Sequence, residues 1–300
     1  MSLDDELSDL LIISLEQAVA APYCGLLLAS AGARVIKVER PEGDFARSYD
    51  NSINGKSAIF AWLNRGKESI SLDLKNKTDK KIFKNMLKKA DVFLSNLTPG
   101  SLEKLELDYK QVKALNPKLI FCEITGYGNS KLAHSKKAYD FLIQAESGLC
   151  SVTGTEKYPS KVGISITDLS TGLTAYSAIL RGIIKRSKTK KGISISISMF
   201  DVMADWMNMP LLAHRYMGGT PKRNGMKHSF IAPYGTFKCK NNDEILISIQ
   251  NNREFEVFCK KILKNQNLFK NPKFQDNPNR YKNRNELDEI INSYFLKYTK

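Results

Sequence analysis

Asp168 is the residue of this sequence whose surroundings best suit it to chemistry. It follows a short, β-branched apolar stretch at residues 162–167, which predicts a buried strand, and it precedes residues of helical period. A carboxylate at such a strand-to-helix corner lies beside N–H groups without helical partners, and the helix dipole favours its ionised form. We interpret Asp168 as a nucleophile or proton-transferring group, while an Asp at a helix start is more often a plain N-cap.

The elements that must position Asp168 alternate between strand and helix. Strands are predicted at five places, several followed by helical patterns: residues 11–15, 34–39, 91–97, 119–124 and 193–198. This alternation predicts an α/β fold, Rossmann-like, with a mostly parallel sheet, helices on both faces and ligands at the carboxyl ends of the strands. A dinucleotide-binding enzyme is the natural rival, but the glycine fingerprint is missing after the first strand.

The composition excludes several classes of protein. No hydrophobic run has transmembrane length and the N-terminus is acidic, so we expect a soluble, cytoplasmic protein without a membrane partner. The five cysteines and three histidines neither form a CxxC motif nor cluster, which predicts no disulfide and no metal. The net charge of +15 comes from lysines spread along the chain, so we expect no nucleic-acid partner.

The chain changes character after Gly219. A turn-rich stretch at residues 221–225 precedes two strand-like segments around a polar turn, which predict a hairpin, and helical patterns at residues 252–264 and 285–298. We therefore predict two domains: a large catalytic domain at residues 1–220 and a smaller α+β domain at residues 221–300.

Motifs along most of the chain carry a family resemblance. They include Gly32-Ala-Arg-Val-Ile-Lys-Val-Glu-Arg-Pro41, Asp91-Val-Phe-Leu-Ser-Asn-Leu-Thr-Pro-Gly100, Lys137-Ala-Tyr139-Asp140 and Asp168-Leu-Ser-Thr-Gly172. Together they resemble the class III CoA-transferase family (CaiB/BaiF type), which also contains α-methylacyl-CoA racemases. The resemblance implies that Asp168 attacks the thioester carbonyl of an acyl-CoA and forms a mixed anhydride, in a closed site that excludes water.

The resemblance also implies which residues contact coenzyme A. Arg40, Lys75, Lys104 and Lys137 are the candidate cations for its phosphates, and Asn96 belongs to a loop that approaches the pantetheine. Position in the family pattern adds Val19 and, at the adenine end, residues 64–67. Taken alone, each lysine is an ordinary exposed surface charge.

The residues Lys137-Ala-Tyr139-Asp140 separate the branches of this family. Racemases place a His at the position of Tyr139, whereas a Tyr with its ordinary pKa near 10 is a poor proton acceptor at neutral pH. Tyr139 is interpreted as a hydrogen-bond donor near the acyl group or as a packed side chain, and Asp140 as a helix cap or a second catalytic carboxylate.

The resemblance points to a dicarboxylate-type branch of the family. The favoured function is a CoA-transferase that moves CoA from succinyl-CoA or another dicarboxyl-CoA to a small carboxylic acid. Candidates for a distal carboxylate of the acyl group are Arg47, Lys227 and His228. The family pattern further implies an interlocked homodimer, and this chain ends early for the family. An acyl-CoA racemase, an intramolecular CoA isomerase and a non-catalytic CoA-binding protein remain as alternatives.

Overall fold

The computed structural model describes residues 4–128, 133 and 136–300 of the chain. These residues divide into two compact units. The first unit comprises residues 1–149 and 161–211, and the second comprises residues 150–160 and 212–300. Each unit is described by itself, and the predicted domain boundary at residue 220 stays a prediction.

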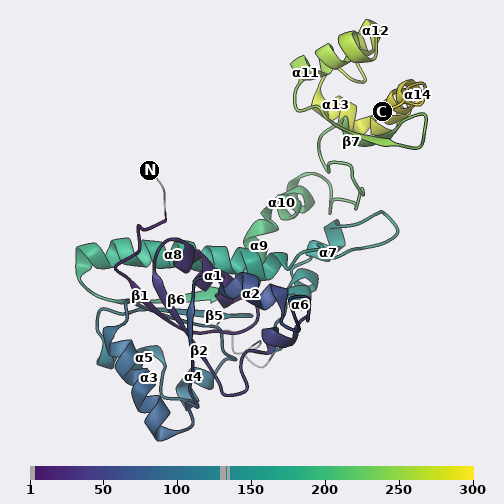
Figure 1. Cartoon of the computed structure of the whole chain (residues 1–300). Coiled ribbons are helices and arrows are strands. Elements are labelled where there is room, and N and C mark those ends of the chain that lie inside the picture. The colour runs from purple at the N-terminus through teal and green to yellow at the C-terminus, as the bar shows by residue number, and fades with distance from the viewer. Residues whose placement is uncertain (1–3, 129–132, 134–135) are drawn as a thin grey trace. The chain divides into compact units, whose positions relative to one another are not determined.

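The first unit is built on a sheet of six parallel strands in the order β3-β2-β1-β4-β5-β6 (Figure 1). The strand bounds are β1 (Leu11–Leu15), β2 (Arg34–Glu39), β3 (Glu68–Ser71), β4 (Val92–Ser95), β5 (Ile120–Thr125) and β6 (Ile193–Ser198). The α/β fold expected from the sequence is confirmed, with every pair in this sheet parallel. Sequence analysis missed β3, since Glu-Ser-Ile-Ser offers one apolar side chain to a strand at the sheet edge.

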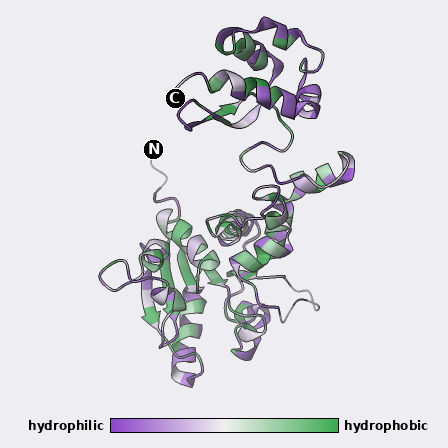
Figure 2. Ribbon diagram, turned by 90° about the vertical axis from the view of Figure 1, so that its right-hand side faces the viewer, coloured by the Kyte–Doolittle hydropathy of each residue, from purple (hydrophilic) through white to green (hydrophobic). Residues whose placement is uncertain are grey.

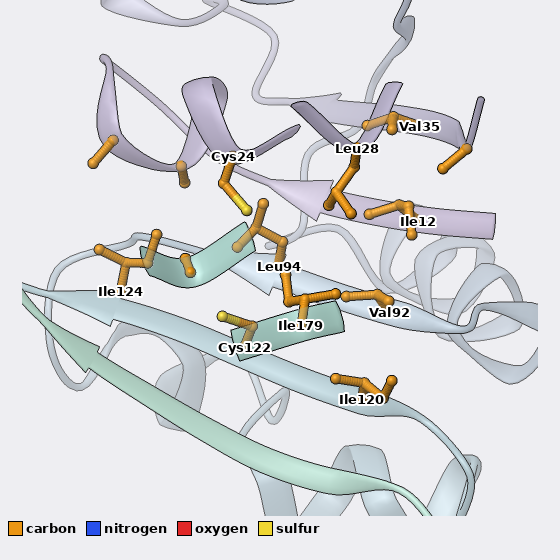
Figure 3. Packing of buried hydrophobic residues seen from close by; sticks show 14 of the residues in the cluster. Ile12, Cys24, Leu28, Val35, Val92, Leu94, Ile120, Cys122, Ile124 and Ile179 are labelled. Carbon is orange, nitrogen blue, oxygen red and sulfur yellow. The ribbon is translucent and has the colours of Figure 1, made fainter. Parts of the chain in front are cut away.

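Helices cover both faces of this sheet. Alternate side chains of the strands point to opposite faces, so Ile12 of β1 packs under α1 (Ala20–Ser30) and α8 (Ile166–Thr189), whereas Ile13 faces the other layer. Figure 3 shows Ile12, Leu94 and Cys122 of neighbouring strands gathered with Cys24 of α1 and Ile179 of α8. The opposite face is covered by α3 (Lys77–Lys89), α4 (Ser101–Lys104) and α5 (Tyr109–Leu115).

Shorter elements complete the first unit. They are η1 (Phe45–Ser48), α2 (Ala58–Asn64), α6 (Asp140–Glu146), α7 (Leu149–Val152), α9 (Met199–Trp206) and α10 (Asn208–Tyr216), of which α7 and α10 continue into the second unit. In Figure 2 the strands of the sheet are mostly green, whereas the surrounding helices mix hydrophobic and hydrophilic colours. This contrast is expected for parallel strands that are buried on both faces.

The second unit contains an antiparallel hairpin and several helices. The hairpin joins β7 (Tyr234–Lys238) and β8 (Glu244–Ser248), as the sequence predicts. Its helices are α11 (Asn252–Val257), the π-helical turn η2 (Phe258–Ile262), α12 (Gln266–Lys270), α13 (Asn277–Lys282) and α14 (Arg284–Phe295). The two predicted helices thus lie at α11–η2 and α14, and Phe237, Phe255, Phe274 and Leu287 form a core of their own.

Two structural absences concern the described part of the chain. None of its helices is long and apolar enough to cross a membrane. Nor does it hold a group of three or more His, Cys, Asp or Glu side chains with the spacing of a metal site.

Candidate active site

A cavity of about 700 Å³ opens in the first unit where the strands end. Gln17 and Ala18 follow β1, Asn96 follows β4, and Ile124 and Thr125 end β5 before Gly126. All of these residues line the cavity. The strand order reverses between β1 and β4, and open parallel sheets bind their ligands at such a switch point. The cavity therefore lies where the fold favours a ligand.

Asp168 lies on the wall of this cavity, in the first turn of α8. The strand predicted at residues 162–167 is wrong, because α8 already begins at Ile166 and the residues before it pair with no strand. The backbone N–H of Val162 instead donates to the side chain of Gln144, at 2.8 Å. Ser165 is the N-cap residue of α8, so the plain N-cap alternative for Asp168 is also excluded.

A glycine one turn further along α8 brings Asp168 toward the strand ends. A Cβ on Gly172 would come within 2.5 Å of the carbonyl oxygen of Ala20 and 3.2 Å of the backbone N of Cys24. Only glycine lets the two helix backbones approach so closely at this crossing. The N-terminus of α8 consequently faces the loop between β1 and α1, and Asp168 and Ala20 line the same cavity.

The carboxyl group of Asp168 has no cation partner in the part of the chain that the structure describes. It forms no ion pair with any described residue. Burial, and then the negative charge of Asp140, raise the pKa of Asp168 from 3.8 to about 7. The protonation of such a carboxyl group changes near neutral pH, and shifts of this kind are concentrated at functional sites.

Asp140 joins two helices rather than facing the cavity. Its carboxylate accepts hydrogen bonds from the backbone N of Thr167 at 2.8 Å, from the Thr167 hydroxyl, and from Nε2 of Gln144 at 2.7 Å. Asp140 thus satisfies an N–H at the start of α8, where such donors have no helical partner. This geometry supports the capping alternative over that of a second catalytic carboxylate.

Three tyrosines line the cavity with Asp168, namely Tyr49, Tyr127 and Tyr139. Tyr139 is the N-cap residue of α6, uses no side-chain hydrogen bond for capping, and is 58% exposed, so it is not a packed side chain. Tyr49 was missed by sequence analysis, because nothing in its local pattern marks it. Burial, and next the charge of Asp168, raise the pKa of Tyr49 to about 12, so its hydroxyl remains a donor at neutral pH.

The predicted cations line two adjoining cavities. Lys104 and Lys137 line the main cavity, and a second cavity of about 410 Å³ is lined by Arg40, Lys75 and again Lys104. Gln17 and Leu97 also line both cavities, so the two are neighbours. Lys75, Lys104 and Lys137 are exposed and form no ion pair with a described residue, whereas Arg40 lies 3.9 Å from Glu42.

Asn96 and Val19 have structural surroundings that the sequence did not reveal. The Asn96 side chain accepts from the backbone N of Gln17 at 2.9 Å and donates to its carbonyl at 2.8 Å, so it ties β4 to the β1–α1 loop. Val19 is the N-cap residue of α1 and lines neither cavity.

The weaker candidates are engaged elsewhere. Lys67 is buried and its Nζ bonds Glu16, so it does not extend toward an adenine. Arg47 makes a bidentate ion pair with Glu39. In the second unit, Lys227 pairs with Asp288 at 2.6 Å, and Nδ1 of His228 accepts from two backbone N–H groups.

The fold and this site define a doubly wound α/β protein with a carboxyl group of raised pKa at its switch point, and comparison with known proteins gives the family. Residues 7–300 match the family model described as CoA-transferase family III, and the chain belongs to this family. It is 36% identical over 289 residues to the succinyl-CoA:glutarate CoA-transferase of Mus musculus, which covers 95% of this chain. The match spans 65% of the mouse protein's length.

Further relatives and a solved structure agree with this assignment. The acetyl-CoA:oxalate CoA-transferase of Acetobacter aceti is 34% identical, over 94% of this chain and 73% of that protein. A crystal structure of a CaiB/BaiF family protein from Brucella suis superposes with a TM-score of 0.83 at 33% identity, covering 99% of this chain and 79% of that one. The resemblance identified from the sequence motifs is thereby confirmed.

Proposed function

We propose that this chain transfers CoA from a dicarboxyl-CoA, such as succinyl-CoA, to a small carboxylic acid, with Asp168 as the nucleophile. The observation that carries the proposal is the carboxyl group of Asp168 on the wall of the switch-point cavity, with a raised pKa and no ion pair to a described residue. Several relatives carry names of succinyl-CoA-dependent transferases, with glutarate or mesaconate as the second acid. Membership of the family supports CoA as a thioester substrate.

The reaction begins with attack by Asp168. A carboxylate oxygen of Asp168 adds to the thioester carbonyl of the donor, the C–S bond breaks, and CoA thiolate leaves an acyl-aspartyl anhydride. The thiolate then attacks the aspartyl carbonyl, which releases the donor acid and forms an aspartyl-CoA thioester. The acceptor carboxylate then attacks the aspartyl-CoA thioester, which releases CoA thiolate and forms a second anhydride. The thiolate attacks the acceptor's carbonyl in this anhydride, which gives the acceptor acyl-CoA and free Asp168. No net proton or redox equivalent is consumed.

The side chains around Asp168 support these steps in different ways. The Tyr49 hydroxyl keeps its proton at neutral pH and is a donor to the oxyanion that forms at the attacked carbonyl. Tyr139 is a second donor, and none of the described residues that line the cavity is a His like the one that racemases use. Asp140 holds the start of α8 in place through Thr167.

The second cavity suits the phosphate end of CoA. Arg40, Lys75 and Lys104 bring three positive side chains to it, and phosphates bind to such clusters. The main cavity, which shares Gln17 and Leu97 with the second, then receives the thioester. The two cavities together give a bound CoA a path from a charged entrance to the half-buried carboxylate.

A homodimer is part of the proposal. Trp206, Met209 and Leu211 of the first unit are more than half exposed, and so is Ile184 of α8. Contiguous patches of exposed apolar side chains mark protein–protein contact surfaces, and Trp206, Met209 and Leu211 come from one short stretch of the chain. Light scattering of the purified chain after gel filtration distinguishes a dimer from a monomer of 33.8 kDa.

Trapping the enzyme-bound intermediate tests the proposed function. The protein is incubated with succinyl-CoA, treated with hydroxylamine or borohydride, digested and examined by mass spectrometry. We expect modification at Asp168, and none in Asp168→Asn. Without modification, α-proton exchange in deuterated water would instead identify a racemase, and CoA binding without either reaction a binding protein.

A further inference from the structure

The cavity wall contains a strained residue directly after Gln17. Ala18 has a φ of 64°, in the left-handed region that residues with a Cβ adopt at an energetic cost. It lies between the end of β1 and the start of α1, and it lines the cavity with Asp168. A strained conformation persists only where the surrounding structure holds it, so the contacts of this loop identify what does so.

The backbone of the loop is held by side chains from three other segments. Oδ1 of Asp44 accepts a hydrogen bond from the N–H of Ala18 at 3.2 Å, and Nζ of Lys37 donates to the carbonyl of Glu16 at 3.3 Å. Asn96 pairs with both backbone groups of Gln17. Three successive residues outside regular structure thus have side-chain partners for their backbone.

Lys37 and Asp44 also bind each other. Nζ of Lys37 lies 2.8 Å from Oδ2 of Asp44, and each side chain is only 1% exposed. The second oxygen of Asp44 accepts from the N–H of Ala46 at 2.9 Å as well as from Ala18. A buried carboxylate with this many partners has a fixed orientation, and the backbone of the loop that it binds is fixed with it.

The side chain of Gln17 has no such partner. It lines both cavities, and its amide forms no hydrogen bond with a described residue. Its direction into the cavity is therefore set by the backbone on either side of it, that is, by Ala18 and by Asn96. A relaxation of Ala18 out of the left-handed region would turn this part of the wall relative to Asp168.

We propose that Lys37 and Asp44 are positioning residues for CoA transfer, which hold Ala18 left-handed and so fix the part of the cavity wall that Gln17 and Ala18 form. This inference rests on the proposed function. Neither side chain lines the cavity that holds Asp168, although Asp44 lines the second cavity and Lys37 also lies 3.8 Å from Glu16. The effect on turnover that we propose is transmitted through the loop. A purely structural pair would contribute to folding, whereas this pair also determines the turnover of the folded enzyme.

Two matched double variants of the full chain separate the effect of the two charges from the effect of the hydrogen bond that the Ala18 N–H donates. Both remove the two charges together, so that neither is left buried without its partner. In Lys37→Met/Asp44→Asn an oxygen acceptor for the Ala18 N–H remains, whereas in Lys37→Met/Asp44→Ala it is lost. We expect the second variant to have a kcat at least about tenfold below the first, because small displacements at a reacting centre cost factors up to about a hundred. The KM for acyl-CoA should change less than threefold, on the order expected when binding is kept.

A glycine at position 18 supplies the diagnostic rescue. Glycine adopts positive φ without the Cβ penalty, so it should hold the loop with less help. Adding Ala18→Gly to Lys37→Met/Asp44→Ala should recover about half of the lost kcat on a logarithmic scale, since the strain is removed. Equal kcat in the two double variants, per folded molecule, would overturn the proposal, and so would absence of rescue.

Hydrogen exchange of the unmodified protein tests the hydrogen bond of the Ala18 N–H without depending on whether the variants fold. Because the Ala18 N–H donates to a buried carboxylate, its exchange should be slowed by at least about a hundredfold relative to an unstructured chain. Fast exchange at Ala18 would contradict the proposal even if the variants do not fold. If the wild type transfers no CoA while the Ala18 N–H is protected from exchange, the proposed function is refuted, but the hydrogen bond from Ala18 to Asp44 is not.

Discussion

Two carboxyl groups in the first unit differ in how their charge is compensated. Glu16 directly follows β1 and has a fully buried side chain, 2.5 Å from Nζ of Lys67 and 3.8 Å from Nζ of Lys37. Burial by itself would raise the pKa of Glu16, but the charges of Lys67 and Lys37 lower it below its ordinary value. Asp168 has no cation partner among the described residues, and its pKa rises to about 7.

The difference in charge compensation separates a carboxylate that stabilises the fold, Glu16, from one that is suited to chemistry, Asp168. A fully paired carboxylate cannot react without losing the ion pairs that it makes. Glu16 therefore has a structural role, in which it holds Lys67 in place under α1. Gly25 makes room for this pair, since a Cβ there would lie 2.8 Å from Oε2 of Glu16 and 2.9 Å from Nζ of Lys67. An uncompensated carboxylate is costly for the fold, and such a cost is typical of functional sites. The comparison leads to four tests, ordered by the size of the expected effect.

Removing the charge of Asp168 should have the largest effect on activity. Asp168→Asn keeps the shape but loses the nucleophile, so kcat for CoA transfer should fall by at least about a thousandfold, as for other catalytic groups. Coupled assays with succinyl-CoA and glutarate or oxalate measure this loss, and calorimetric CoA binding serves as the control. Transfer at more than a tenth of the wild-type rate would refute the assignment.

Removing the charge of Glu16 should instead damage the fold. Glu16→Gln leaves Lys67 buried with an uncompensated charge, which costs about 3–5 kcal/mol of unfolding free energy. The matched control is Glu68→Gln, because its ion pair with Arg34 is exposed and such pairs contribute about 0–1 kcal/mol. Urea unfolding compares the two variants. A loss in Glu16→Gln no larger than in the control would show that the buried pair is not a scaffold.

The stability of the protein should reveal the cost of ionising Asp168. Its pKa is higher in the folded state than in the unfolded chain, so it costs stability as pH rises from about 4 to about 7, and the cost is then constant. Asp168→Asn should therefore be more stable than wild type at pH 8, by about 1–4 kcal/mol. The difference should vanish near pH 4. A variant that is less stable at pH 8 would argue against a raised pKa.

The pH dependence of activity offers the finest test. The nucleophile must be ionised, so kcat/KM should rise with pH and level off above a midpoint near 7. Asp140→Asn removes the neighbouring negative charge and should lower this midpoint by about one unit, while its oxygen still accepts from Thr167. An unchanged midpoint in this variant would mean that burial alone sets the pKa of Asp168.

The sequence by itself determined much of the architecture. Five of the six strands of the sheet, the hairpin in the second unit and the family followed from local patterns of apolar residues and from motifs, which need no knowledge of distant contacts. Asp168 and Lys137 were also singled out in this way, and both line one cavity. Local patterns suffice here because burial on a parallel sheet selects continuous apolar runs.

Only the tertiary structure decided what the side chains do. The start of α8 at Ile166 depends on Asp140 and Gln144, which come from another helix. Tyr49 reaches the cavity from a short helical turn, and Lys67 pairs with a carboxylate 51 positions away instead of facing a ligand. The charge state of Asp168 likewise depends on which groups surround it in space. Desolvation and charge pairing act between residues that are neighbours only after folding, so no local pattern encodes them.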